Sequence, residues 1–224
     1  MITTLFASVL VAVNFSASVA SAADIQKSGR TEIFANPFIA IGFNPQTRAL
    51  TGYVQALRTE PGRTDACQFL FSGKVDKPEL VSVVIKEIPG SAAGPVTSVY
   101  RGSITSSAKQ QNLLIDPKQL PGDCEWILPT IGEPKVLEIG KNISLPIDKS
   151  ETGAWIGVSV IEAKRAYFHK EPITASKGKA FLVTGDVVYI VEDKSDWLYV
   201  KYRGRKKQTA GWIRKTAAVQ LPNS

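Results

Sequence analysis

Short runs of apolar and aromatic residues, separated by Gly, Pro and charged breaks, dominate the chain. In the first 128 residues, the runs that predict strands are 38–43, 49–58, 67–75, 79–88, 99–105, 112–115 and 124–128. Runs of this length with turn residues between them are typical of antiparallel strands, and the sequence contains no long amphipathic helical pattern. The pattern therefore predicts an all-β fold that begins with a β-sandwich or small barrel.

The run at 79–88 differs from its neighbours because apolar residues occupy both of its faces. Leu80 and Val84 alternate with Val81 and Ile85, so we expect a strand in the middle of a sheet. The segment 129–146 is rich in Gly and Pro and predicts irregular structure with one short strand at 136–139. A further strand is expected at 155–161, leading into a second unit.

Residues 180–221 contain three apolar and aromatic runs, each closed by a Gly or a charged turn. This pattern predicts consecutive antiparallel strands of a small barrel. In the run that starts at Trp197, alternation assigns Leu198, Val200 and Tyr202 to the core and the intervening residues to the other face. The preceding run, 187–191, is apolar on both faces, which predicts a two-sided or strongly curved strand.

The N-terminus has the pattern of a secretory signal peptide over residues 1–22. The apolar run 5–13 leads to the small residues Ala20, Ser21 and Ala22, and we expect cleavage before Ala23. The alternative is a membrane anchor, but the run is shorter than the roughly 20 residues that span a bilayer. We therefore predict a periplasmic or secreted protein without an integral membrane segment after processing.

Cys67 and Cys124 are the only two cysteines. In an oxidising compartment we expect them to form a disulfide, and the alternatives are a free buried pair or a metal site. A metal site lacks ligands because His169 is the only histidine and there is no third cysteine. We predict no metal and no cofactor.

Charge divides the chain into two parts. Residues 23–148 hold 13 Lys and Arg against 13 Asp and Glu, whereas residues 149–224 hold 14 against 7. This asymmetry predicts two domains, 23–155 and 160–224, of which the second would attract a polyanionic partner. The alternative is a solvated hairpin loop, in which Arg203 and its basic neighbours only keep a strand edge from pairing. Nucleic acid is not an expected partner of an exported protein.

The stretch 166–221 resembles the bacterial SH3-like (SH3b) domain, which occurs in exported and wall-associated proteins. The resemblance rests on an aromatic opening with a Pro-containing loop, YFHKEP, and on a turn at Gly185 and Asp186 before the run VVYIVE. It also rests on Trp197 at the entry to LYVKY, and on Trp212 before a short helical turn. It implies a small SH3-like barrel after the N-terminal β domain.

By the same resemblance, the second domain would bind short peptides through aromatic side chains. The residues that match the aromatic surface of the family are Tyr167, Trp197, Tyr199 and Trp212. Where the eukaryotic branch has a Pro and a Tyr, this chain has Arg214 and Ala217, so proline-rich ligands are not expected. The alternative is that the aromatic residues only cover the barrel and pack against the first domain.

We therefore expect a non-enzymatic binding protein of the bacterial envelope whose SH3-like module recognises a peptidoglycan peptide or an envelope protein. The alternative is an inhibitor or immunity-type protein, whose N-terminal β domain blocks an enzyme while the SH3-like domain is structural. No catalytic residue is predicted, because His169 is expected on the surface without an orienting partner. Carboxylate pairs such as Glu60 with Asp65, or Asp123 with Glu125, would act only at a suitable separation in space.

Overall fold

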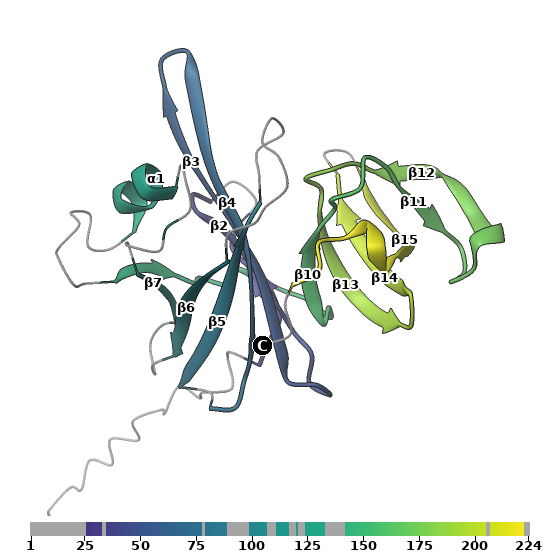
Figure 1. The fold of residues 1–224 in the computed structure, drawn as a ribbon, viewed down its shortest axis with the longest axis horizontal. Helices are drawn as coiled ribbons and strands as arrows, with labels where there is room; N and C mark the ends of the chain where they lie inside the picture. The colour runs from purple at the N-terminus through teal and green to yellow at the C-terminus, as the bar shows by residue number, and fades with distance from the viewer. Residues whose placement is uncertain are drawn as a thin grey trace, which may run out of the picture.

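The chain forms two antiparallel sheets that follow one another in the sequence (Figure 1). The structure is a computed structural model that describes residues 26–32, 35–77, 79–88, 99–106, 111–116, 120, 124–132, 142–204 and 207–221. The first sheet has nine strands in the order β8-β7-β6-β5-β4-β3-β2-β1-β9 and curves into a half-barrel. The second sheet has six strands in the order β10-β13-β14-β15-β11-β12. The predicted all-β class is confirmed.

The first sheet is a meander in which consecutive strands of the chain are neighbours. Its strands are β1 (Gly29–Arg30), β2 (Phe38–Phe43), β3 (Ala49–Glu60), β4 (Arg63–Lys74), β5 (Leu80–Glu87), β6 (Val99–Ser106), β7 (Gln111–Ile115), β8 (Ile143–Pro146) and β9 (Glu151–Thr152). Each predicted strand from 38 to 115 is present, with ends displaced by a few residues. The expected signal peptide at 1–22 and the short strand at 136–139 lie outside the described residues.

β3 and β4 form a hairpin that extends past its neighbours, and Figure 1 shows its end projecting from the sheet. The two strands pair from Ala49 opposite Lys74 to Glu60 opposite Arg63. Pro61 and Gly62 form the turn, and Gly62 has a φ of 80°. Pro followed by Gly suits a tight turn of this kind, because Pro fixes its φ and Gly adopts a positive φ at little cost.

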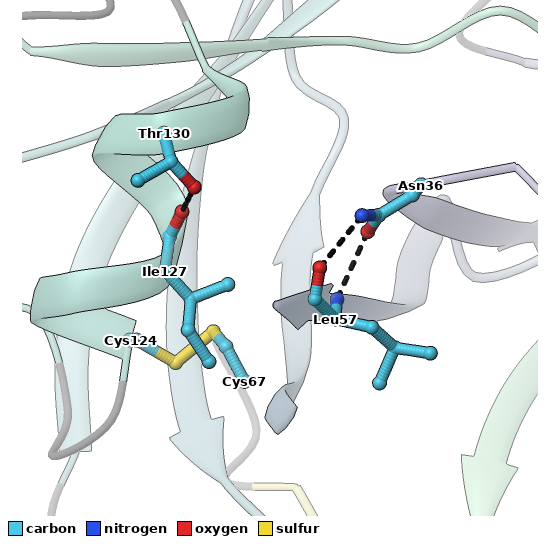
Figure 2. Close-up of a disulfide and its surroundings, with 6 residues drawn as sticks. All are labelled: Asn36, Leu57, Cys67, Cys124, Ile127 and Thr130. Atoms are coloured by element: carbon cyan, nitrogen blue, oxygen red, sulfur yellow. Dashed lines mark hydrogen bonds between the residues drawn. A yellow bond between two sulfur atoms is a disulfide. The ribbon is translucent and has the colours of Figure 1, made fainter. Parts of the chain in front are cut away.

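The segment predicted as a strand at 124–128 is the helix α1 (Cys124–Ile131), so that prediction is wrong. Cys124, Ile127 and Leu128 are its buried residues, and their spacing is the i, i+3, i+4 pattern of one helical face. The predicted disulfide between Cys67 and Cys124 is present, with Cα atoms 4.7 Å apart, and attaches α1 to β4. Figure 2 shows this link and the Thr130 hydroxyl donating to the Ile127 carbonyl at 2.7 Å.

The core of the first unit lies on one face of the half-barrel sheet. Val81, Val83 and Ile85 of β5 point into it, while Leu80 is 54% exposed. β5 lies between β4 and β6 as predicted for an inner strand, although only one of its faces is buried. The largest fully buried side chains of this core are Phe69, Phe71, Ile39, Ile41, Leu50, Ile85, Ile104, Leu113, Ile115 and Ile127.

The second sheet encloses a smaller core of its own. Its strands are β10 (Gly157–Val160), β11 (Ala166–His169), β12 (Lys177–Leu182), β13 (Val187–Lys194), β14 (Trp197–Arg203) and β15 (Gln208–Arg214), with 3-10 turns at Thr174–Ser176 and Lys215–Ala217. Leu198 and Val200 are buried in the core and Tyr202 packs against it, as alternation predicted. Other members include Phe168, Leu182, Val188 and Ile213.

The two sheets share a third apolar cluster, which joins them. Tyr53 of the first sheet and Val158 and Tyr189 of the second belong to it. Val187 and Tyr189 face this cluster while Val188 faces the core of the second unit, which explains the apolar pattern on both faces of β13. The Trp155 indole N–H donates to the Ile41 carbonyl at 2.8 Å, so the connecting segment is also attached to β2.

Candidate functional site

Three of the four predicted aromatic residues lie on two paired strands of the second sheet. Trp197 and Tyr199 point to the face of β14 opposite to Leu198 and Val200, because strand side chains alternate. Trp212 of β15 lies directly across from Tyr199. The fold therefore places these side chains on one surface, which we call the aromatic face.

Tyr199 and Trp212 form the centre of the aromatic face. Their ring centroids lie 5.3 Å apart at an interplanar angle of 64°, an edge-to-face contact. Both side chains are half-buried. Each ring therefore has a fixed position and retains surface that a ligand can cover.

Trp197 is buried beneath its neighbours and does not offer a contact surface to a ligand. Only 6% of it is exposed, because the His169 ring packs edge-on at 4.7 Å and the Arg214 guanidinium lies 4.1 Å from its ring centroid. Arg214 is oriented by a hydrogen bond to the Thr174 hydroxyl at 2.5 Å. Trp197 is thus a packing residue of the second unit.

The prediction that His169 lies on the surface is wrong. It is 8% exposed in β11, opposite Trp212, and its Nδ1–H donates to the Ile173 carbonyl at 3.1 Å. This bond fixes one ring nitrogen as a donor, and the ring itself packs on Trp197. His169 therefore stabilises the aromatic face from within the sheet.

Tyr167 extends the aromatic face onto β11. Its ring contacts that of Phe181 of β12, with the ring centroids 5.6 Å apart. Cations lie over both rings: the Lys177 ammonium is 3.6 Å from the Tyr167 centroid, and the Arg165 guanidinium is 4.9 Å from that of Phe181. Phe181 is 43% exposed and was not among the predicted residues. The sequence signal that could have identified Phe181 is an aromatic residue that closely follows two lysines in the segment 177–182, KGKAFL.

The aromatic face lies away from the junction between the sheets. The apolar contact with the first sheet is made mainly through β10 and β13, Arg203 at the end of β14 reaches Glu151 of β9, and Figure 1 shows β11 and β12 on the side farthest from the first sheet. In the described parts of the chain, none of Tyr167, Trp197, Tyr199 and Trp212 belongs to the apolar cluster that joins the sheets. The fold thus leaves this surface accessible.

A second candidate surface lies at the end of the β3–β4 hairpin. A cavity of about 280 Å³ is lined there by Arg58, Glu60, Arg63, Asp65, Trp126 and Ile127. Trp126 of α1 is 71% exposed beside it. The hairpin brings Glu60 and Asp65 to one cavity, yet each carboxylate is paired with an arginine at 2.6 Å, which is not the environment of a general acid. Asp123 lies outside the described residues.

A polar network that the sequence did not reveal lies at the junction of the sheets. The Arg30 side chain donates through Nε and Nη2 to the Glu151 carboxylate, and through Nη1 to the Tyr189 hydroxyl at 2.9 Å. Arg203 of β14 lies 3.3 Å from the same carboxylate. No local motif marks these residues, because they are far apart in the sequence and meet only through the tertiary fold.

Burial changes the proton affinity of the side chains in this network. It lowers the pKa of Arg30, but the bonds to Tyr189 and Glu151 outweigh it and hold that pKa above its ordinary value. Burial raises the pKa of Tyr53 far above its ordinary value, and the neighbouring Tyr189 adds to the shift. The pKa of Tyr189 is also raised by burial, against the opposing effect of Arg30.

The described residues bring no three His, Cys, Asp or Glu side chains close enough to hold a metal ion. Of the helices they form, none has the length and apolar character needed to cross a bilayer. In comparisons with family models, curated proteins and solved structures, nothing matches this chain significantly. The geometry of the sites is therefore the basis for a functional proposal.

Proposed function

We propose that this chain is an exported, non-enzymatic binding protein of the bacterial envelope that recognises a peptide through the aromatic face of its second sheet. The observation that carries the proposal is the Tyr199–Trp212 pair, which is half-buried and lies outside the apolar cluster that joins the two sheets. Large rigid rings bury much area with little loss of conformational entropy, and such side chains dominate the energetics of recognition surfaces.

The cations around the aromatic face favour a ligand with negative charge. Lys177, Arg165 and Arg214 each lie over one of its rings. Peptides of the cell wall or acidic segments of an envelope protein carry carboxylates that would interact with these groups, and a basic surface also accelerates encounter. We therefore favour a carboxylate-bearing peptide as the ligand.

Two further observations support the proposal. The antiparallel strands of the second sheet and its closing 3-10 turn agree with the resemblance of 166–221 to SH3-like domains. The disulfide between Cys67 and Cys124 is typical of proteins in an oxidising compartment and supports a periplasmic or secreted location.

Sedimentation with purified peptidoglycan tests the proposal. We expect the chain from residue 23 onwards to sediment, and the double variant Tyr199→Ala, Trp212→Ala to lose about a hundredfold in affinity. The control is Trp126→Ala, which removes an exposed aromatic from the first unit and should leave sedimentation unchanged. Trp197→Ala is unsuitable because that side chain is buried and its loss would destabilise the fold.

Failure of the wild-type chain to sediment would exclude a wall peptide as the ligand. Photo-crosslinking from position 199 in cells would then identify a protein partner at the same face. If crosslinks form only from position 126, the aromatic face is not the binding site and the proposal fails.

The second candidate is an inhibitor or immunity-type protein that uses its first sheet, with the second sheet structural. The projecting β3–β4 hairpin and the exposed Trp126 beside it favour this function, since an extended hairpin with an aromatic neighbour can enter the cleft of an enzyme. It predicts that Trp126→Ala abolishes capture of a soluble envelope enzyme while the Tyr199, Trp212 variant retains it.

A further inference from the structure

A cleft between the two sheets has a volume of about 280 Å³ and is lined by residues from both. The first sheet contributes Arg30, Tyr53 and Gln55, and the second contributes Asp186, Tyr189 and Arg203. A cavity of this size is near the lower limit of small-molecule sites, so it suits a ligand about as large as one amino acid. It is separate from the aromatic face described above.

The Tyr53 hydroxyl is the first indication that the cleft binds a ligand. Tyr53 is 3% exposed and lines the cleft, yet its hydroxyl has no hydrogen-bond partner in the described chain. This hydroxyl is not one of the fully buried polar atoms without a partner, so its oxygen is open to the cleft and can donate to a molecule bound there. A ligand atom in the cleft would supply the missing acceptor.

The arginines of the cleft add further donors. A guanidinium has five N–H groups, and the three bonds of Arg30 to Glu151 and Tyr189 leave two of its N–H groups unused within the described residues. Arg203 reaches Glu151 only through long contacts of 3.3 and 3.5 Å, and half of its side chain is exposed. Its guanidinium can therefore turn toward a ligand.

The carboxylates around the cleft are already engaged. Glu151 accepts from Arg30 and Arg203, while one Asp186 oxygen accepts the Val183 amide N–H at 2.8 Å. Asp186 also interacts with the neighbouring Tyr202 hydroxyl, whose pKa is raised by burial and by this carboxylate. The unused hydrogen-bonding capacity of the cleft thus consists mainly of donors, two of them cationic, and it matches a ligand group that only accepts.

We propose that this cleft binds the carboxylate of a small molecule of amino-acid size, with Arg203 and Arg30 pairing with its oxygens and Tyr53 donating a hydrogen bond. Planar guanidinium groups match the geometry of a carboxylate, and these charge-assisted bonds are among the strongest in proteins. Because both sheets contribute donors, the bound carboxylate would also hold the two units together.

Titration of the chain from residue 23 onwards with N-acetylalanine, in both enantiomers, tests this proposal by calorimetry and by amide chemical shifts. The neutral analogue N-acetylalaninamide is the matched ligand control. We expect the acid to shift the resonances of residues around Tyr53 and Arg203, and the amide to bind at least about tenfold more weakly.

Two variants locate the site. Tyr53→Phe keeps the ring and removes the hydroxyl, so it should weaken binding of the acid about tenfold without lowering the thermal midpoint of the free protein. Its control is Tyr167→Phe on the aromatic face. Arg203→Gln should weaken binding by at least the same factor, whereas Arg58→Gln on the hairpin should leave it unchanged.

Equal binding of acid and amide would overturn the proposal, as would no binding of the acid or stronger binding of N-acetylglucosamine. The proposal would also be overturned if the two single variants, Tyr53→Phe and Arg203→Gln, both bound the acid with the affinity of the wild type. None of these results affects the proposal for the aromatic face, because the peptidoglycan assay depends on Tyr199 and Trp212.

Discussion

Tyr53 makes the stability of the protein depend on pH through the contact between the two units. Its side chain lies in the cluster between the sheets, and burial raises its pKa well above the ordinary value. A folded pKa above the unfolded one means that the neutral phenol contributes its full stability below about pH 10, the ordinary tyrosine value. That contribution is lost as the pH rises from there toward the folded pKa.

We therefore predict that the protein loses stability above pH 10 and that Tyr53→Phe reduces this loss. For one tyrosine that stays neutral in the fold, the free energy of unfolding falls by about 1.4 kcal/mol per pH unit. Denaturant unfolding from pH 8 to 11 measures the difference between the two proteins, with Tyr167→Phe as the control. If Tyr53→Phe and the wild type show the same alkaline slope, Tyr53 is not the group responsible.

At the scale of elements, α1 depends on its covalent link to β4. The helix has only eight residues, too few to be stable alone, and contains Pro129. Its buried residues Ile127 and Leu128 complete the core of the first unit. The exposed Trp126 is held beside the hairpin by the same attachment, so the geometry of the second candidate surface depends on the disulfide.

Replacing Cys67 and Cys124 together by Ser should therefore destabilise the first unit by about 4 kcal/mol, as expected for a loop closed over 57 residues. Denaturant unfolding of the variant and the wild type, both without reductant, measures the change. Reduced wild-type protein should behave like the variant. A midpoint equal to that of the oxidised wild type would contradict this role of the disulfide.

At the scale of the whole molecule, the two units are in close backbone contact where β2 meets β10. A Cβ atom placed on Gly42 of β2 would lie 2.3 Å from the Cα atom of Gly157 of β10. Thr51 of β3 lies opposite Gly42, and its hydroxyl accepts the Val158 amide N–H at 2.8 Å, so β10 is close to β2 and hydrogen-bonded to β3. Only glycine at position 42 allows this approach.

Gly42→Ala should push the sheets apart and cost about 1–3 kcal/mol, a typical penalty for overpacking. We expect earlier unfolding in denaturant and faster proteolysis in the connecting segment around Gly153. Gly204→Ala is the control, since the nearest atom to its added methyl group is the tip of the Tyr202 ring at 3.3 Å. Identical proteolysis of wild type and Gly42→Ala would show that this contact does not hold the units together.

Local patterns in the sequence determined the strands and their inner faces. Alternation assigned Leu198, Val200 and Tyr202 to the core correctly, because side chains of a strand point to its two sides in turn whatever the strand packs against. The pairing of Cys67 with Cys124 also followed from the sequence, since the chain has no other cysteine. The helix at 124–131 was missed because a short apolar run does not distinguish a strand from one buried helical face.

Tertiary structure alone decided which predicted site residues are accessible and which distant residues meet. Trp197 and Trp212 look alike in the sequence, but His169 and Arg214 cover the first and leave the second half-buried. Arg30 and Tyr189 are separated by 159 positions, and their contact at the cleft depends on how the two sheets pack. Periodicity encodes the inside and outside of each element, whereas the contacts between elements arise from long-range packing that no local pattern records.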